Sequence, residues 1–154
     1  MKKWMIAALA ALAVILPRLG SPATDIGNLE PVAVVQVIGA PNGVLLRTDT
    51  GAEGRGRNFA EAVRTLRSSA PKEVFLDTAD FVLLWGNPDR GPILELFRPA
   101  CGVCLAGPET NLEEAAAYLT QHPPGRTLAE LRAGEGSLPR LIVKEGRGLF
   151  ARNG

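Results

Sequence analysis

Cysteine, histidine and aromatic residues are scarce in this sequence, which limits the chemistry available to it. The 154 residues include two cysteines and one histidine, and aromatic side chains make up 5%. The single histidine, His122, cannot build a histidine metal site, and its surroundings, QHPPG, predict a solvated position in a loop. Because aromatic residues are few, we expect leucine, valine and alanine to fill most of the core.

Several common functional motifs are also missing. The sequence contains no G-x-x-x-x-G-K, H-E-x-x-H or G-x-S-x-G pattern. Its basic residues do not form the cluster that a nucleic-acid-binding surface requires, so no nucleic-acid partner is expected. We predict neither a cofactor nor a bound metal.

One hydrophobic run marks the N-terminus. Lys2 and Lys3 precede an apolar stretch, Trp4 to Leu16. As a helix this stretch reaches about 20 Å, short of a hydrocarbon core about 30 Å thick. We therefore predict that residues 1–23 are a secretory signal peptide, with an uncleaved signal-anchor as the alternative. Without these residues the 17 basic residues fall to 14, against 16 acidic ones.

Strand and helix patterns alternate through the rest of the chain, residues 28–154, which we predict to be one domain. The expected strands are residues 31–40, 44–48, one or two strands within 73–86, 101–107 and 138–146; the expected helices are residues 58–68, 93–97, a helix opening at 110 and 127–132. Capping boxes are predicted for Asn58 with Glu61, Thr110 with Glu113, and Thr127 with Glu130. The Gly-rich residues 49–57 are expected to form a loop. These patterns predict the α/β class, with one mixed sheet of about four to five strands, helices packed on it and a signal helix before it.

The two cysteines, Cys101 and Cys104 in RPACGVCLAG, have the spacing of a thiol–disulfide redox motif. Such motifs place the first cysteine at a helix N-terminus, where the helix dipole stabilises the thiolate, but here the next predicted helix begins near Asn111. If the segment is extended, the two Cα atoms lie about 10 Å apart, whereas a disulfide needs roughly 7 Å or less, and the side chains point to opposite faces. A turn at Gly102 would instead permit a bridge, which export favours. We predict two half-buried strand cysteines, and the alternative is an exported thiol–disulfide protein that uses this pair.

Acidic residues provide two further candidate sites. Asp49 in LLRTDTGA resembles the Asp-Thr-Gly signature of aspartic proteases, which would require a homodimer. A polar loop follows it instead of an apolar strand, so we expect a solvated aspartate that opens a loop. Glu73, Asp77 and Asp80 could do acid–base work or bind a cation. However, Asp77 and Asp80 have opposite parity on a strand, so we predict surface positions.

Residues 54–89, GRGRNFAEAVRTLRSSAPKEVFLDTADFVLLWGNPD, combine features found together in one family. A polar glycine loop precedes a helix of the type T-x-x-E-A-x-x-x-L, a break with proline, and an apolar strand that ends near glycine. ILELFRPACGVCLAG adds a short helix, an arginine-containing turn and a strand ending in glycine. SLPRLIVKEGRGLFARNG adds Leu-Pro, a strand and a pattern close to G-x-x-V-F-x-x-G. With NLEPVAVVQVIGA at its start, the chain resembles the first domain of the Ger(x)C lipoproteins, the C subunits of spore-germination receptors.

The resemblance implies a non-catalytic, exported module that acts in nutrient-triggered spore germination through protein–protein contacts. Its implied partners are the integral-membrane subunits of a germinant receptor, and its implied place is the outer face of the cytoplasmic, or inner spore, membrane, or secretion. The N-terminal segment would associate with the membrane if uncleaved. The family's lipid-attachment cysteine is absent after the apolar run, and its second domain is not present in this sequence. Residues 49–57 and the turn NPDRGP, residues 87–92, are the expected contact surfaces.

Overall fold

The computed structural model describes residues 29–151, so the predicted signal segment lies outside the described residues. The strands are β1 (Leu29–Pro31), β2 (Val34–Ala40), β3 (Gly43–Thr48), β4 (Glu53–Gly56), β5 (Glu73–Phe75), β6 (Phe81–Trp85), β7 (Gly102–Ala106), β8 (Arg140–Lys144) and β9 (Arg147–Ala151). The helices are α2 (Phe59–Ser69), α3 (Arg90–Leu96), α4 (Leu112–Gln121), α5 (Leu128–Arg132) and the 3₁₀ turn η3 (Leu76–Thr78). Within residues 29–151, no helix has the length and apolar character needed to cross a membrane.

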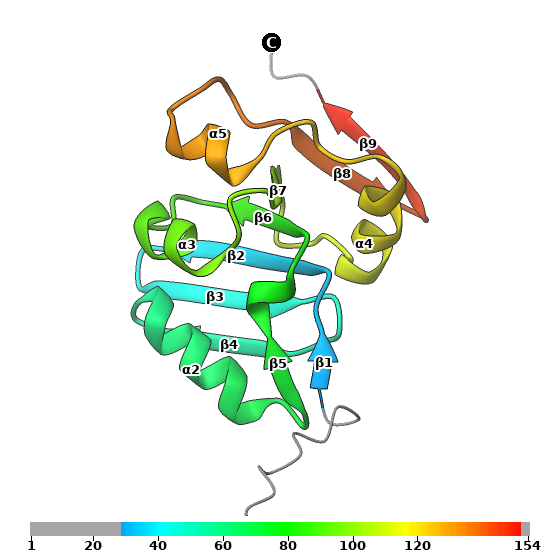
Figure 1. The fold of residues 1–154 in the computed structure, drawn as a ribbon. Coiled ribbons are helices and arrows are strands. Elements are labelled where there is room, and N and C mark those ends of the chain that lie inside the picture. The colour runs from blue at the N-terminus through cyan, green and yellow to red at the C-terminus, as the bar shows by residue number, and fades with distance from the viewer. Residues whose placement is uncertain (1–28, 152–154) are drawn as a thin grey trace, which may run out of the picture.

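Seven strands form one mixed sheet in the order β4-β3-β2-β6-β7-β8-β9, as Figure 1 shows. Along the middle of the sheet, β2, β6, β7 and β8 run parallel. At its two ends, β3, β4 and β9 each pair antiparallel with the strand that precedes them in the chain. A separate parallel pair joins β1 to β5. The predicted α/β class and mixed sheet are therefore confirmed, whereas four to five strands is too few.

Three strands were not predicted: β1, in the separate pair, and two strands at the two ends of the large sheet. β4 falls within residues 49–57, which were expected to be a loop, and β9 follows the last predicted strand. The residues of β4, Glu-Gly-Arg-Gly, have low strand propensity. β4 exists because it pairs with β3 on one edge and packs against α2 on one face. Such tertiary contacts leave no period-two pattern in the sequence.

Local capping signals fix the start of two helices. The Asn58 side chain accepts a hydrogen bond from the Glu61 backbone N–H at 2.9 Å and caps α2, as predicted. Thr127 and Glu130 form the predicted capping box at α5. Both caps satisfy N–H groups that the first helical turn leaves without partners.

The predicted capping box between Thr110 and Glu113 is wrong. Asn111 caps α4 instead, and its side-chain oxygen accepts from the backbone N–H groups of Glu113 at 3.1 Å and Glu114 at 3.2 Å. Thr110 is buried. Asparagine is at least as good an N-cap as threonine, so the helix begins one residue later.

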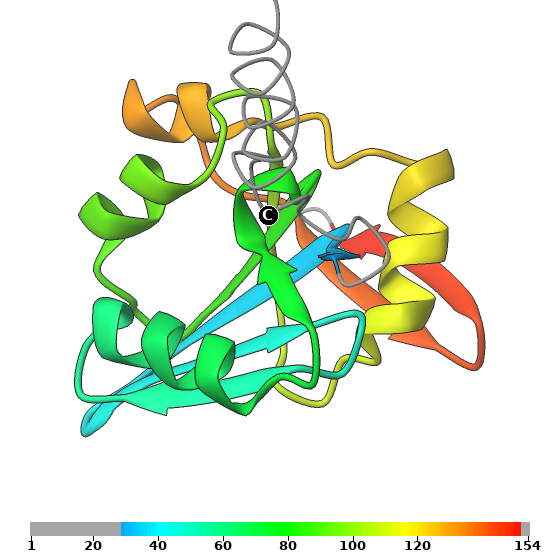
Figure 2. The same ribbon diagram turned by 60° about the horizontal axis from the view of Figure 1, so that its bottom comes forward.

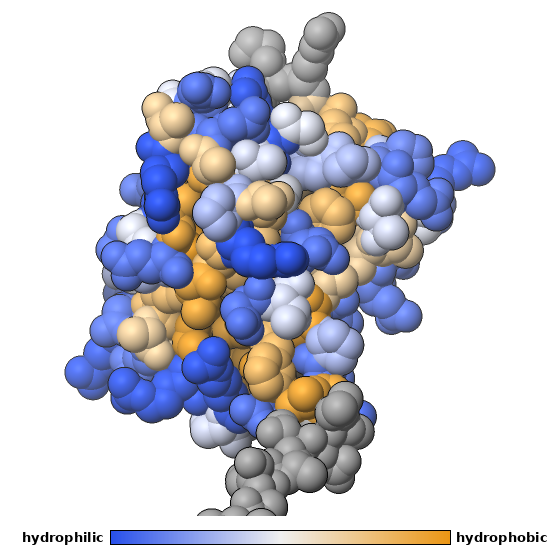
Figure 3. All heavy atoms as spheres, viewed as in Figure 1, coloured by the Kyte–Doolittle hydropathy of each residue, from blue (hydrophilic) through white to orange (hydrophobic). Residues whose placement is uncertain are grey.

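Helices lie on both faces of the large sheet, as Figure 2 shows, and apolar side chains between the sheet and these helices form two cores. The major core lies under α2, α3 and α5 and includes Val35, Val37, Leu46, Leu66, Val82, Leu84, Ile93, Cys101, Val103 and Leu128. The minor core lies under α4 and consists of Val34, Leu83, Cys104, Ala106, Leu112, Ala115, Leu119 and Leu141. Phe59 and Phe97 are the buried aromatic residues of residues 29–151, so the expectation of an aliphatic core is confirmed. Figure 3 shows the side of the molecule seen in Figure 1, where hydrophilic residues surround apolar residues that remain visible between them.

Candidate functional site

The two cysteines lie on opposite faces of the sheet. Cys104, in β7, packs into the minor core, and Cys101, which directly precedes β7, packs into the major core. Both are free, and both are fully buried rather than half-buried as predicted, because each packs into a core between the sheet and its helices. The segment is extended from Gly102 onward, as predicted, because it pairs with β6 on one side and β8 on the other. The sheet therefore separates the two thiols, and they do not form a disulfide.

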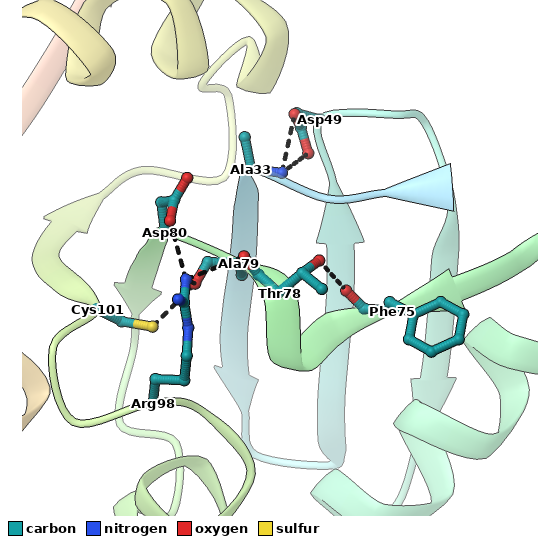
Figure 4. Close-up of polar contacts among 8 residues, drawn as sticks. All are labelled: Ala33, Asp49, Phe75, Thr78, Ala79, Asp80, Arg98 and Cys101. Atoms are coloured by element: carbon teal, nitrogen blue, oxygen red, sulfur yellow. Dashed lines mark hydrogen bonds and ion pairs between the residues drawn. The ribbon is translucent and has the colours of Figure 1, made fainter. Parts of the chain in front are cut away.

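Cys101 belongs to a cluster of polar contacts at the amino ends of β6 and β7 (Figure 4). Its Sγ donates a hydrogen bond to the Ala79 backbone oxygen at 2.9 Å. The Arg98 guanidinium donates through Nη2 to the backbone oxygens of Thr78 at 3.2 Å and Ala79 at 3.1 Å, and to Asp80 Oδ1 at 2.9 Å. The cluster satisfies carbonyl groups that the irregular segment between β5 and β6 leaves outside any ladder.

Arg98 holds two connections together in this cluster. It lies between α3 and β7, and the oxygens that it binds lie between β5 and β6. Arg98 and Asp80 are both exposed, so their ion pair contributes little stability by itself. The two backbone hydrogen bonds matter more, because Nη2 joins the connection before β7 to the connection before β6. This role was not predicted, because it joins residues about twenty positions apart.

The environment of both thiols keeps them protonated at neutral pH. Burial raises the pKa of the Cys104 thiol to about 12. Burial also raises the pKa of Cys101, and the nearby Arg98 charge and hydrogen bonds offset this only in part. The thiolate is the reactive form of cysteine, so a raised pKa and burial both reduce nucleophilicity. This geometry does not favour the thiol–disulfide alternative.

Both cysteines are expected to resist alkylation while the chain is folded. At pH 7 iodoacetamide should label each thiol at least about a hundredfold more slowly than in concentrated guanidinium, because labelling requires an opening of the core. Mass spectrometry of the digested chain measures each site separately, and Cys104→Ala serves as the control that reports Cys101 alone. Fast labelling of Cys101 in the folded chain would contradict this expectation and favour a redox role.

Asp49 binds backbone rather than facing solvent. Its Oδ1 accepts a hydrogen bond from the Ala33 N–H at 3.2 Å, which Figure 4 shows, and another from the Val34 N–H at 3.1 Å, at the beginning of β2. The side chain is half-buried, so the expected solvated position is only partly correct, although Asp49 does begin the connection between β3 and β4. This arrangement gives Asp49 a structural role in capping β2.

The other acidic candidates do not converge on one site. Glu73 begins β5, Asp77 lies in η3 and Asp80 precedes β6, and all three are exposed, as predicted. Within residues 29–151, no three cysteine, histidine or acidic side chains lie close enough to hold a metal ion.

His122 is exposed, as predicted, and it caps the carboxyl end of α4. Its ring stacks on Tyr118, with 4.7 Å between the ring centroids. Tyr118 also contacts Phe150 in β9, at 5.9 Å. The contact between Tyr118 and Phe150 was not predicted, because β9 was not expected.

A buried polar network, which was not predicted, joins β2 and β3 to the carboxyl end of β7. The Gln36 side chain is fully buried in β2 and donates through Nε2 to the backbone oxygens of Ala106 at 3.1 Å and Gly107 at 2.8 Å. Its Oε1 accepts from Arg47 Nη1 at 3.2 Å, and Arg47 also donates to the Pro108 oxygen at 2.7 Å. A glutamine within the valine-rich run PVAVVQVIGA was the available signal.

No family model, curated protein or solved structure matches this chain.

Proposed function

We propose that this chain is an exported, non-catalytic module of the germinant-receptor C-subunit type, which acts in nutrient-triggered spore germination through protein–protein contacts. The observation that carries the proposal is the order of elements in the segment that resembles the Ger(x)C family. The helix lies at α2, the break at the residues before β5, the apolar strand at β6 with Gly86 after it, and the short helix at α3. The strand that ends in glycine is β7, followed by Gly107.

The arginine-containing turn supports the same proposal. In the resemblance, an arginine separates the short helix from the following strand, and Arg98 lies at this point. Its guanidinium binds backbone oxygens of Thr78 and Ala79. An arginine here thus has a structural purpose, which is expected of a scaffold whose surfaces contact partners.

The two segments expected to make contacts, residues 49–57 and 87–92, belong partly to regular secondary structure. Within residues 49–57, only part of the segment remains a loop, because β4 occupies Glu53–Gly56. The turn at residues 87–92 runs into α3, which begins at Arg90 with Asp89 as its N-cap. The exposed residues of both segments remain candidate contact points, and the partners we propose are the integral-membrane subunits of the receptor. Association with the membrane would come from the N-terminal segment, if it is not cleaved.

A deletion strain tests this proposal. Spores of the organism that encodes this chain should lose the response to at least one nutrient when the gene is deleted, and the wild-type gene should restore it. A gene carrying Cys101→Ala should restore germination equally well, because the proposed module does not use its thiols. The full chain should also co-purify with the two membrane subunits when all three are co-expressed and extracted in mild detergent.

Two results would contradict the proposal. Normal germination of the deletion strain in every nutrient would remove the proposed role. Failure of Cys101→Ala to restore germination, with normal protein levels, would favour the thiol–disulfide alternative.

A further inference from the structure

Strand β9 is an open edge of the large sheet. It lies at the end of the strand order and pairs only with β8 among the described residues, as Figure 1 shows. Glu145 and Gly146 join the two strands with positive φ angles of 51° and 73°, the geometry of a tight type I′ hairpin. Because hydrogen-bonded and non-hydrogen-bonded pairs alternate along an antiparallel ladder, every second residue of β9 directs its backbone groups away from β8. These groups can pair with another strand.

One face of the β8–β9 hairpin also exposes apolar side chains. Leu149 is 53% exposed, and it is the exposed large hydrophobic residue of residues 29–151. Its cross-strand partner is Ile142, and neither residue packs into the major or the minor core. The other face of the hairpin packs on α4 through Phe150 and Tyr118. The hairpin therefore has a core-facing side and an apolar outer side next to its open edge.

The same outer side carries two positive charges that take part in no ion pair within the described part of the chain. Lys144 and Arg147 are direct cross-strand partners, and like charges in this position destabilise a sheet. Glu145 lies in the turn itself, and Glu114 of α4 accepts a hydrogen bond from the Gly146 N–H at 3.0 Å. Arg140, at the other end of this row, lies with its guanidinium 5.2 Å from the centre of the Trp85 ring.

The opposite edge of the sheet is also formed by a strand with one partner, but its surroundings and side chains differ. α2 packs against one face of β4, and the exposed side chains of Glu53 and Arg55 form an ion pair at 3.4 Å. Charged, self-neutralised edges of this kind discourage pairing with other chains. The contrast identifies β9 as the edge suited to a partner.

We infer that the β9 edge binds an extended segment of a partner protein in which acidic and apolar residues take turns at every second position, so that both kinds lie on one face of the added strand. The partner strand adds to the sheet through backbone hydrogen bonds, places an apolar side chain beside Leu149, and places a carboxylate beside Arg147. This inference rests on the proposed function, because it names a contact surface of the module and the chemistry of the segment that it binds. A second copy of this chain fits less well, because it would bring another Lys144–Arg147 pair to the same positively charged edge.

Peptide binding to the full chain, purified in a mild detergent, tests the inference. The probe is a fluorescent ten-residue peptide in which glutamate and valine take turns at every second position, with threonine at the positions between them. The comparison peptides replace glutamate by lysine or place proline at the centre, which interrupts a ladder. Fluorescence anisotropy gives the Kd of each. We expect the wild-type chain to prefer the glutamate peptide. Arg147→Glu should weaken its binding about fivefold and improve binding of the lysine peptide to a similar degree. Arg55→Glu, on the opposite edge, is the matched control and should change neither.

A reversal of preference cannot arise from unfolding, so it would support the β9 site directly. Absence of saturable binding, equal binding of the proline peptide, or an Arg147→Glu variant with unchanged preference would overturn the inference. So would concentration-dependent dimers of the wild-type chain that Arg147→Glu alters, because they would assign the edge to a second copy. If peptide binding fails while the chain still co-purifies with the membrane subunits, this inference is wrong and the proposed function stands. If the peptide binds as expected and co-purification fails, the β9 site stands and the receptor partnership is wrong.

Discussion

Replacing Gly54 by alanine is expected to destabilise the folded chain by about 2–3 kcal/mol, because the added methyl group has no room. Gly54 is buried in β4, directly under α2. A Cβ atom at this position would lie well inside van der Waals contact of the Ala62 backbone oxygen and the Leu66 backbone nitrogen. Backbone atoms in a helix cannot move aside as a flexible side chain can, so α2 would have to shift away from the sheet.

Urea unfolding of the wild-type chain and the variant measures this effect. The matched control is Gly91→Ala in α3, where the nearest atom to a new Cβ is Asp89 Oδ1 at 3.5 Å, an ordinary contact. Alanine is favoured over glycine within a helix, so this control should be as stable as the wild-type chain or up to about 1 kcal/mol more stable. Equal stability of Gly54→Ala and the wild-type chain would show that α2 does not approach β4 as closely as described.

Replacing Gln36 by leucine is expected to cost about 2–4 kcal/mol of unfolding free energy, although leucine is apolar and similar in size. The wild-type side chain serves the Ala106 and Gly107 oxygens and the Arg47 guanidinium. Leucine would remove the side-chain donor from both carbonyl groups and leave the Gly107 oxygen with the Thr110 N–H alone, at 3.1 Å. The penalty for such groups exceeds the gain from burying additional apolar surface.

A double-mutant cycle with Arg47 tests whether Gln36 and Arg47 stabilise the fold as one network. Arg47→Met alone removes the hydrogen bonds to Gln36 and Pro108, and the double variant removes both polar groups. Because the two residues share one network, the double variant should lose less stability than the two single variants added together, as measured by urea unfolding. A Gln36→Leu variant with wild-type stability would contradict a structural role for this network.

The elements that the sequence predicted correctly are those specified by neighbouring residues. The β2–β3 hairpin follows from two apolar runs around Asn42-Gly43, and α2 follows from its cap at Asn58 and its apolar spacing. β4 and β9 were missed because their strand conformation depends on partners rather than on their own composition. In β4, glycine was interpreted as a loop residue, whereas Gly54 is required by the close approach of α2.

The candidate site was predicted only in part, for a similar reason. Strand alternation alone places Cys104 on the face opposite to Cys101, and the structure has them there. The contacts of Cys101 with Ala79, and of Arg98 with Thr78, join segments that are distant in the sequence. No local pattern specifies which backbone oxygens an arginine will reach. The unusual feature that was visible, Gln36 among valines, indicated a buried polar group but not its partners.

The position of β2 determines the order in which the sheet can assemble. One edge of β2 pairs with β3, the next strand in the chain, whereas its other edge pairs with β6, which follows only after α2 and β5. The unit from β2 to α2 can thus form early from nearby residues, with one edge of a valine-rich strand still exposed. Closure by β6, β7 and β8 joins distant segments in parallel, the slow kind of contact in folding, so this half-built sheet is the stage most vulnerable to aggregation.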